Sequence, residues 1–332
     1  MRRNTLKTAL LGALAGLGLG TATTEAREPF MIAPIPPNAL VGVPVGANLP
    51  LDGVWVSQRN LVSWGPVLDD NGNEVGLDLE AAAAGVQLHF VPGWEILGGS
   101  YRASALVAGL RIRQEAVDPI PDFLQDDALN FALSDTLISP LNIHWELQPG
   151  IFAMAGTGVI LPTGENTGRN AANDFSEVGW GAGGYTFFGQ TGFSYLRDGW
   201  NLSGSFMYFH STENPRTNYN SGDEILLTGT AMKDLGFVDD ALAGFSFGPV
   251  GYYRQQITED DNNGTFFGGQ TFGKARSLGY GLAMSKRLGP VNVEFNYTRE
   301  AGSRGTYSPQ AFQLSFTVPL AIFDCPWRRE RD

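Results

Sequence analysis

The sequence predicts an all-β fold, a transmembrane antiparallel β-barrel of about 12 strands with both termini in the periplasm. Short segments alternate bulky apolar residues with small or polar ones, as strands do when one face meets lipid and the other a wet lumen. Charged residues make up 17% of the 332 residues, against roughly 25% in a soluble domain. No stretch after residue 26 holds the roughly 18 consecutive apolar residues of a spanning helix. A closed barrel is the remaining way across a membrane.

Residues 1–26 predict a cleaved secretory signal peptide. Basic residues open the segment, the apolar stretch 8–20 follows, and Thr24-Glu25-Ala26 precedes the expected cleavage point. Cleavage after Ala22 stays an alternative. An exported barrel is expected in the outer membrane of a Gram-negative cell.

Residues 27–50 hold six prolines and show no periodicity. The favoured interpretation is an extended proline-rich leader in the periplasm. The alternative is a plug threaded into the lumen. The sequence leaves both open.

The barrel is expected over residues 51–320. The alternation is clearest near the C-terminus, where Val293 and Phe295 are flanked by Glu294 and Asn296. The expected strands are 51–64, 77–91, 100–117, 133–147, 150–161, 177–188, 199–210, 222–233, 245–256, 274–287, 290–299 and 310–320.

The connections support this strand order, because outer-membrane barrels have short periplasmic turns and long outer loops. Connections four and ten are the tight turns at 148–150 and 288–290. The longest connections, 118–130, 162–176 and 257–273, are all odd-numbered. Connection eight, 234–244, is longer than this rule predicts. An even strand count then puts both termini in the periplasm.

A C-terminal tail, residues 321–332, follows the last expected strand. Many outer-membrane proteins end on an aromatic residue at that point. The tail is a departure from this pattern and leaves open how the outer-membrane assembly machinery recognises the C-terminus of this chain. That machinery and outer-membrane lipid are the expected partners, together with a small-molecule solute. Nucleic acid is not expected, because the net charge is −12. Cys325 is the single cysteine, which excludes an intrachain disulfide.

Polar residues on the inner face are the candidates for lining the lumen. They hydrate the interior or set its permeability, and the acidic pair Glu146 and Glu294 would disfavour anions. The candidates are Gln87, His89, Asn142, His144, Glu146, Asn292, Glu294 and Asn296.

Catalytic residues, a metal site and a cofactor are not expected. The chain has three histidines, none at metal-site spacing from another. His210-Ser211 with Glu213 is the best hydrolytic candidate. Adjacent strand residues point to opposite faces, so His210 is poorly placed to activate Ser211.

Ordered landmarks resemble the family of outer-membrane proteins named for the meta pathway of phenol degradation. They are Leu161-Pro162-Thr163-Gly164, Asn214-Pro215 with Tyr219 and Ser221-Gly222-Asp223-Glu224, Gly248 to Gln256 with Asp260-Asp261, and Arg299-Glu300. The resemblance spans most of residues 51–320. The proline-rich leader and the C-terminal tail depart from it.

The resemblance implies a porin-like channel or transporter for passive uptake of a small hydrophobic or aromatic compound, without defined binding residues. The main alternative is a structural or surface-interaction barrel that works through acidic outer loops such as Asp126-Asp127 and 259–261. An outer-membrane hydrolase is the less favoured alternative.

Overall fold

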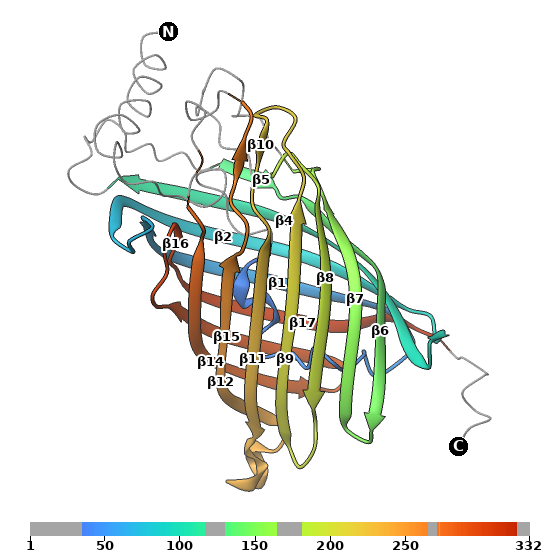
Figure 1. Ribbon diagram of the computed structural model, residues 1–332. Helices are drawn as coiled ribbons and strands as arrows, with labels where there is room; N and C mark the ends of the chain where they lie inside the picture. Colours follow the sequence, from blue (N-terminus) through green and yellow to red (C-terminus); the bar gives the residue numbers. More distant parts are fainter. Residues whose placement is uncertain (1–34, 117–129, 165–180, 265–270, 272, 324–332) are drawn as a thin grey trace.

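The computed structural model describes residues 35–116, 130–164, 181–264, 271 and 273–323. They form a closed antiparallel barrel of twelve strands, as predicted (Figure 1). No helix among them is long and apolar enough to span a bilayer. The barrel strands are β1 (Gly53–Leu68), β2 (Glu74–Val91), β4 (Gly99–Ala116), β6 (Thr136–Gln148), β7 (Ile151–Leu161), β8 (Thr186–Tyr195), β9 (Trp200–Ser211), β11 (Glu224–Asp234), β12 (Phe245–Gln256), β14 (Arg276–Leu288), β15 (Val291–Glu300) and β17 (Gln310–Ile322).

Short elements decorate this barrel. Three are single turns of 3-10 helix: η1 (Pro37–Leu40), η3 (Leu235–Phe237) and η4 (Asp240–Leu242). The short strands are β3 (Glu95–Ile96), β5 (Asn130–Leu133), β10 (Tyr219–Asn220), β13 (Asp261–Asn262) and β16 (Thr306–Tyr307).

The barrel closes through β1, which pairs with β2 on one side and β17 on the other. Arg59, for example, lies opposite Gly85 of β2 and Ser315 of β17. Every barrel strand therefore has two neighbours, and its backbone N–H and C=O groups bond to protein. A bilayer core supplies no water for unpaired groups, so this closure is what permits β-strands to cross it.

The facing rule from the sequence describes the wall well. On β14, Leu278 and Leu282 are 48% and 47% exposed, whereas their neighbours Ser277 and Ala283 are 1% and 2% exposed. The same pattern makes Phe206 exposed and Met207 buried on β9. An outer surface this apolar is stable only against lipid.

The two ends of the barrel differ. Connections β4–β6, β7–β8, β9–β11 and β12–β14 are long and lie at one end, the long-loop end, where β10 pairs with β13. The tight turns β6–β7, β8–β9 and β14–β15 lie at the other, the short-turn end. The start of β1 and the end of β17 pair at the short-turn end, through Gly53 and Ile322. The β11–β12 connection is the longer exception there and carries η3 and η4.

The sixth strand is displaced from its expected position. It was expected at 177–188, but β8 covers Thr186–Tyr195. The described residues 181–184 belong to the preceding connection, where Asp135 accepts hydrogen bonds from the backbone N–H groups of Gly164 and Ala182. This connection is rich in glycine, which has no side chain to indicate a lipid or lumen face. The sequence pattern therefore did not distinguish it from a strand.

A β-bulge on β6 changes the face of one predicted residue. The pairing of β6 with β7 shifts between Ile138 and Leu141. Ser139 and Asn142 are consequently both buried. Leu137, which simple alternation would place on the lipid face with Leu141, is 9% exposed and packs in the interior cluster. The predicted signal peptide, residues 324–332 of the tail with Cys325, and Asp126-Asp127 lie outside the described residues.

Candidate functional site: the barrel lumen

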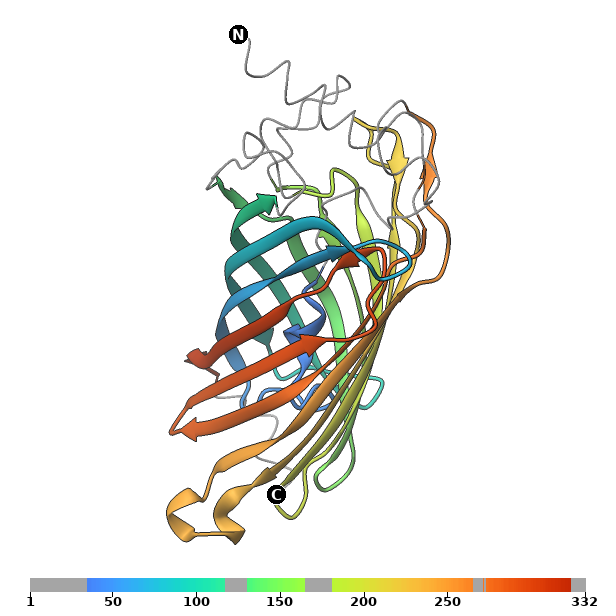
Figure 2. The ribbon, with the colours of Figure 1, turned by 90° about the vertical axis from the view of Figure 1, so that its left-hand side faces the viewer.

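Residues 35–50, here called the lumen segment, lie inside the barrel (Figure 2, dark blue). η1 is its one regular turn, and Pro37 supplies the fixed φ that favours such a turn. Ile35, Val41 and Val45 are 9%, 1% and 7% exposed. A chain lying free in the periplasm would leave these side chains in water. The leader interpretation therefore does not describe residues 35–50.

Polar side chains of one wall hold the backbone of the lumen segment. The N–H of Gly42 donates to Thr230 Oγ1 at 2.9 Å, and the N–H of Gly46 donates to Ser194 Oγ at 2.8 Å. Asn38 Nδ2 donates to Asn296 Oδ1 at 3.3 Å. An irregular buried segment needs side-chain partners for its peptide groups. Hydroxyl and amide residues at inward positions meet this need.

The opposite wall holds the segment through longer side chains. Arg59 Nη1 donates to the carbonyl of Ala39 at 2.5 Å, and His144 Nδ1 donates to the carbonyl of Gly46 at 3.1 Å. A carbonyl only accepts, so His144 carries a proton on Nδ1.

The interior also contains an apolar cluster, which a purely polar lumen would lack. Phe188 of β8 and Phe209 of β9 lie with ring centroids 6.1 Å apart. Ala39 and Leu40 of the lumen segment pack against the cluster. Its buried members are Ile35, Val41, Leu137, Ile160, Phe188, Met207, Phe209, Leu226, Met232, Val250, Tyr252 and Ala283.

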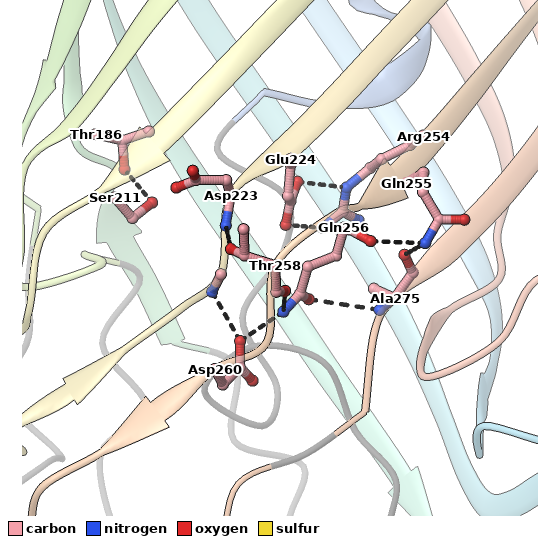
Figure 3. Close-up of polar contacts among 11 residues, drawn as sticks. Thr186, Ser211, Asp223, Glu224, Arg254, Gln255, Gln256, Thr258, Asp260 and Ala275 are labelled. Atoms are coloured by element: carbon pink, nitrogen blue, oxygen red, sulfur yellow. Dashed lines mark hydrogen bonds and ion pairs between the residues drawn. The ribbon is translucent and has the colours of Figure 1, made fainter.

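A buried polar network occupies the long-loop end of the lumen (Figure 3). Arg254 forms a two-fold hydrogen-bonded ion pair with Glu224. Asp260 accepts from Gln256 Nε2 at 2.7 Å and from the N–H of Gly222 at 2.8 Å. These residues belong to the family landmarks found in the sequence. The landmarks therefore meet in space and tie β11 and β12 to the loop that follows β12.

A second part of this network joins β12 to β15. Tyr252 donates its hydroxyl to Glu300 Oε1 at 2.8 Å, and Ser303 donates to Glu300 Oε2 at 2.7 Å. Both carboxylate oxygens of Glu300 are thereby bonded.

The predicted lumen residues are spread around the barrel rather than gathered in one site. His89, Asn142, His144 and Asn296 are 7% exposed or less and share the inner face with the lumen segment. Gln87, Asn292 and Glu294 are half-buried on that face. Glu146 is exposed near the β6–β7 turn, where it accepts the N–H of Gly150 at 3.1 Å.

Sequence reasoning missed two inward arginines, Arg59 of β1 and Arg102 of β4. Arg102 lies opposite Asn142, and Arg59 reaches the lumen segment. The signal for Arg102 was present: Ser100, Arg102 and Ser104 are polar at every second position. The expectation that acidic groups alone set the charge of the lumen is therefore incomplete.

The hydrolytic candidate is split between two faces. His210 points outward and bonds Asp223 Oδ1 at 2.7 Å, whereas Ser211 bonds Thr186 on the inner face at 3.0 Å (Figure 3). The two side chains cannot form a nucleophile–base pair in this arrangement. The part of the chain described here contains no group of three metal-ligating His, Cys, Asp or Glu side chains.

The sequence profile of the Phenol_MetA_deg family, described as the MetA-pathway of phenol degradation, matches residues 66–317. The chain belongs to this family. Comparison with curated proteins finds no match. Among solved structures, the fold is similar to the COG4313 outer membrane channel from Pseudomonas putida F1, with a TM-score of 0.65 and 13% identity over 82% of this chain and 97% of that one.

Other barrels are more distant. The translocator domain of the autotransporter NalP from Neisseria meningitidis has a TM-score of 0.43 and 12% identity, over 81% of this chain and 88% of that one. The TodX monoaromatic hydrocarbon channel has a TM-score of 0.36 and 9% identity, over 80% and 89%. The family match assigns the chain to this family, and the likeness to the COG4313 protein shows a β-barrel fold of the outer-membrane type.

Proposed function

We propose that this protein is an outer-membrane channel for the passive uptake of a small hydrophobic or aromatic compound. The observation that carries the proposal is the apolar cluster inside the lumen, with Phe188, Met207 and Phe209 facing inward. A general hydrophilic pore gains nothing from inward aromatic side chains, whereas an apolar solute that displaces the lumen segment would meet an apolar surface there. The family's link to phenol degradation supports the same class of solute.

The direction of the barrel is part of the proposal. An exported chain with its signal removed would place the short-turn end in the periplasm and the long-loop end outside, following the usual loop asymmetry. Outer-membrane lipid would cover the apolar wall, and the assembly machinery would insert the chain. The solute would enter at the network around Arg254 and leave near β6–β7. No catalytic step is proposed.

A deletion strain tests the function. Cells lacking the protein, supplied with a phenolic compound at limiting concentration, should take it up more slowly than the parent. A plasmid copy should restore the rate. Equal rates in the parent and the deletion strain at limiting substrate would exclude the proposed uptake role.

A structural barrel is the second candidate, because the lumen segment and the Glu224–Arg254 network fill much of the interior with bonded groups. Planar-bilayer recording separates the two. The channel proposal expects discrete conductance steps from the purified mature protein. A closed structural barrel gives none.

A further inference from the structure

Two arginine and two histidine side chains lie on the inner face of four consecutive barrel strands. They are Arg59 of β1, His89 of β2, Arg102 of β4 and His144 of β6. The register brings them together: His89 bonds Ser57, two residues before Arg59, while Ser100, two residues before Arg102, lies opposite His144. The charges of both arginines act on His89, and that of Arg102 also acts on His144.

Each of these side chains has a buried nitrogen without a hydrogen-bond partner. The atoms are Arg59 Nε, His89 Nδ1, Arg102 Nε and His144 Nε2. Both arginines are half-buried overall, and Arg59 Nη1 is already bonded to the carbonyl of Ala39. Buried polar atoms normally have partners, and four orphans together on one face are unusual.

The positive charge is not neutralised by direct ion pairs. The ion pairs among the described residues are Arg113–Glu80, His210–Asp223 and Arg254–Glu224, none of which involves Arg59 or Arg102. Glu294 is the acid whose charge acts on Arg59, and both residues lie opposite Ser315, on either side of β17. Glu294 is bonded by Asn292 at 2.8 Å instead. A guanidinium stays charged at every physiological pH, so Glu294 offsets part of the charge of Arg59, whereas no acid among the described residues offsets that of Arg102.

From this arrangement we infer that the guanidinium groups of Arg59 and Arg102 form a binding site for the carboxylate of a small apolar acid. A guanidinium group matches the geometry of a carboxylate, which accepts two hydrogen bonds at once. Leu106, four residues beyond Arg102 on the same face of β4, packs against the apolar cluster and gives the ring or alkyl body an apolar neighbour. The inference deepens the proposed uptake function by naming an anionic solute class, and its link to uptake rests on that function.

Binding can be measured apart from transport, by isothermal titration of the detergent-purified full chain. The probes are benzoate, its neutral analogue benzyl alcohol, and inorganic phosphate. Benzoate should bind the wild type, and Arg102→Gln and Arg59→Gln should each weaken it about tenfold or more, since a charge-assisted hydrogen bond is lost. Arg102→Lys should retain much of the affinity. Benzyl alcohol should show no dependence on either arginine.

The control is Arg299→Gln, because Arg299 is an exposed arginine on β15 and its removal changes the net charge equally. Heat-modifiable gel mobility reports whether each variant forms the barrel. If Arg102→Gln does not, Arg59→Gln and Arg102→Lys decide the question.

Unchanged benzoate affinity in the folded arginine variants, or no benzoate binding by the wild type, would overturn the inference. Phosphate binding as tight as that of benzoate, with the same arginine dependence, would also overturn it, since the site would then hold any anion. A deletion strain with normal uptake would remove the proposed transport function and leave the titration result standing.

Discussion

Arg254 and Glu224 face each other inside the barrel with two N–H···O distances of 2.8 Å, and their side chains are 6% and 1% exposed. Removing one partner leaves the other charge buried without its hydrogen-bonded counter-ion, which costs about 3–5 kcal/mol. We predict that Glu224→Gln lowers the free energy of unfolding by about that amount. Urea unfolding in lipid vesicles, followed by tryptophan fluorescence, measures it.

The matched control for this pair is Glu80→Gln. Glu80 lies 3.8 Å from Arg113, with side chains 58% and 42% exposed, so its loss should cost about 0–1 kcal/mol. Similar losses in the two variants would contradict the assignment of Glu224–Arg254 as a desolvated pair.

The outer face provides a second prediction. Leu282 lies mid-strand on β14 and is 47% exposed on the outer face of the barrel. Leu282→Arg should destabilise the folded barrel by about 2–4 kcal/mol, the cost of an arginine near the bilayer midplane. Leu282→Phe keeps an apolar side chain and should fold with little loss. Equal urea midpoints for the two variants would show that this face does not meet lipid.

The lumen segment provides a third prediction. Deletion of residues 35–48 removes the bonds to Thr230, Ser194, Arg59 and His144, while all twelve strands keep their pairing. Single-channel conductance should rise, because the segment no longer fills the lumen. A synthetic peptide of residues 35–48 added to the short-turn side should lower it again. Equal conductance before and after deletion would mean that the segment does not limit passage.

The β1–β2 turn provides a pH-dependent prediction. Burial and the neighbouring charge of Asp69 raise the pKa of Asp70 to about 6. The folded turn therefore holds this proton more tightly than the unfolded chain, whose carboxyl has a pKa near 3.8. Stability should fall as pH rises from about 4 to 6 and stay lower above. Asp70→Asn should protect the turn from protease at pH 8 and make little difference at pH 4.

Asp69→Asn is the opposite case. Hydrogen bonds from Asn71 and Asn73 lower the pKa of Asp69 against the effect of burial. This variant should make the turn more protease-sensitive at pH 8. The same change in protease sensitivity in both variants would contradict the opposite environments assigned to Asp69 and Asp70.

Period-2 alternation was enough to predict the twelve strands and the closed barrel, because most inward positions are small or polar. It failed where the interior is apolar. Phe187 faces out and Phe188 faces in, so the start of β8 shows no alternation, and the strand was placed too early. At β6, the bulge beside Pro140 reverses which residues face the lumen and which face outward. A regular two-residue alternation cannot predict such a reversal.

The lumen was only partly predictable for a related reason. His89, His144 and Asn296 stood out because apolar residues flank them. Arg59 lies between the polar residues Gln58 and Asn60, so no alternation of apolar and polar residues shows that Arg59 faces the lumen. The contacts of the lumen segment were beyond sequence reasoning, since an irregular segment finds its partners only once the barrel has closed.

An uptake channel must let a small aromatic molecule cross the outer membrane through this lumen. Asymmetric vesicles with lipopolysaccharide in the outer leaflet, loaded with a fluorophore that phenol quenches, measure that crossing. We predict faster quenching in vesicles that contain the protein than in protein-free vesicles of the same composition. The same quenching rate in both would contradict the account.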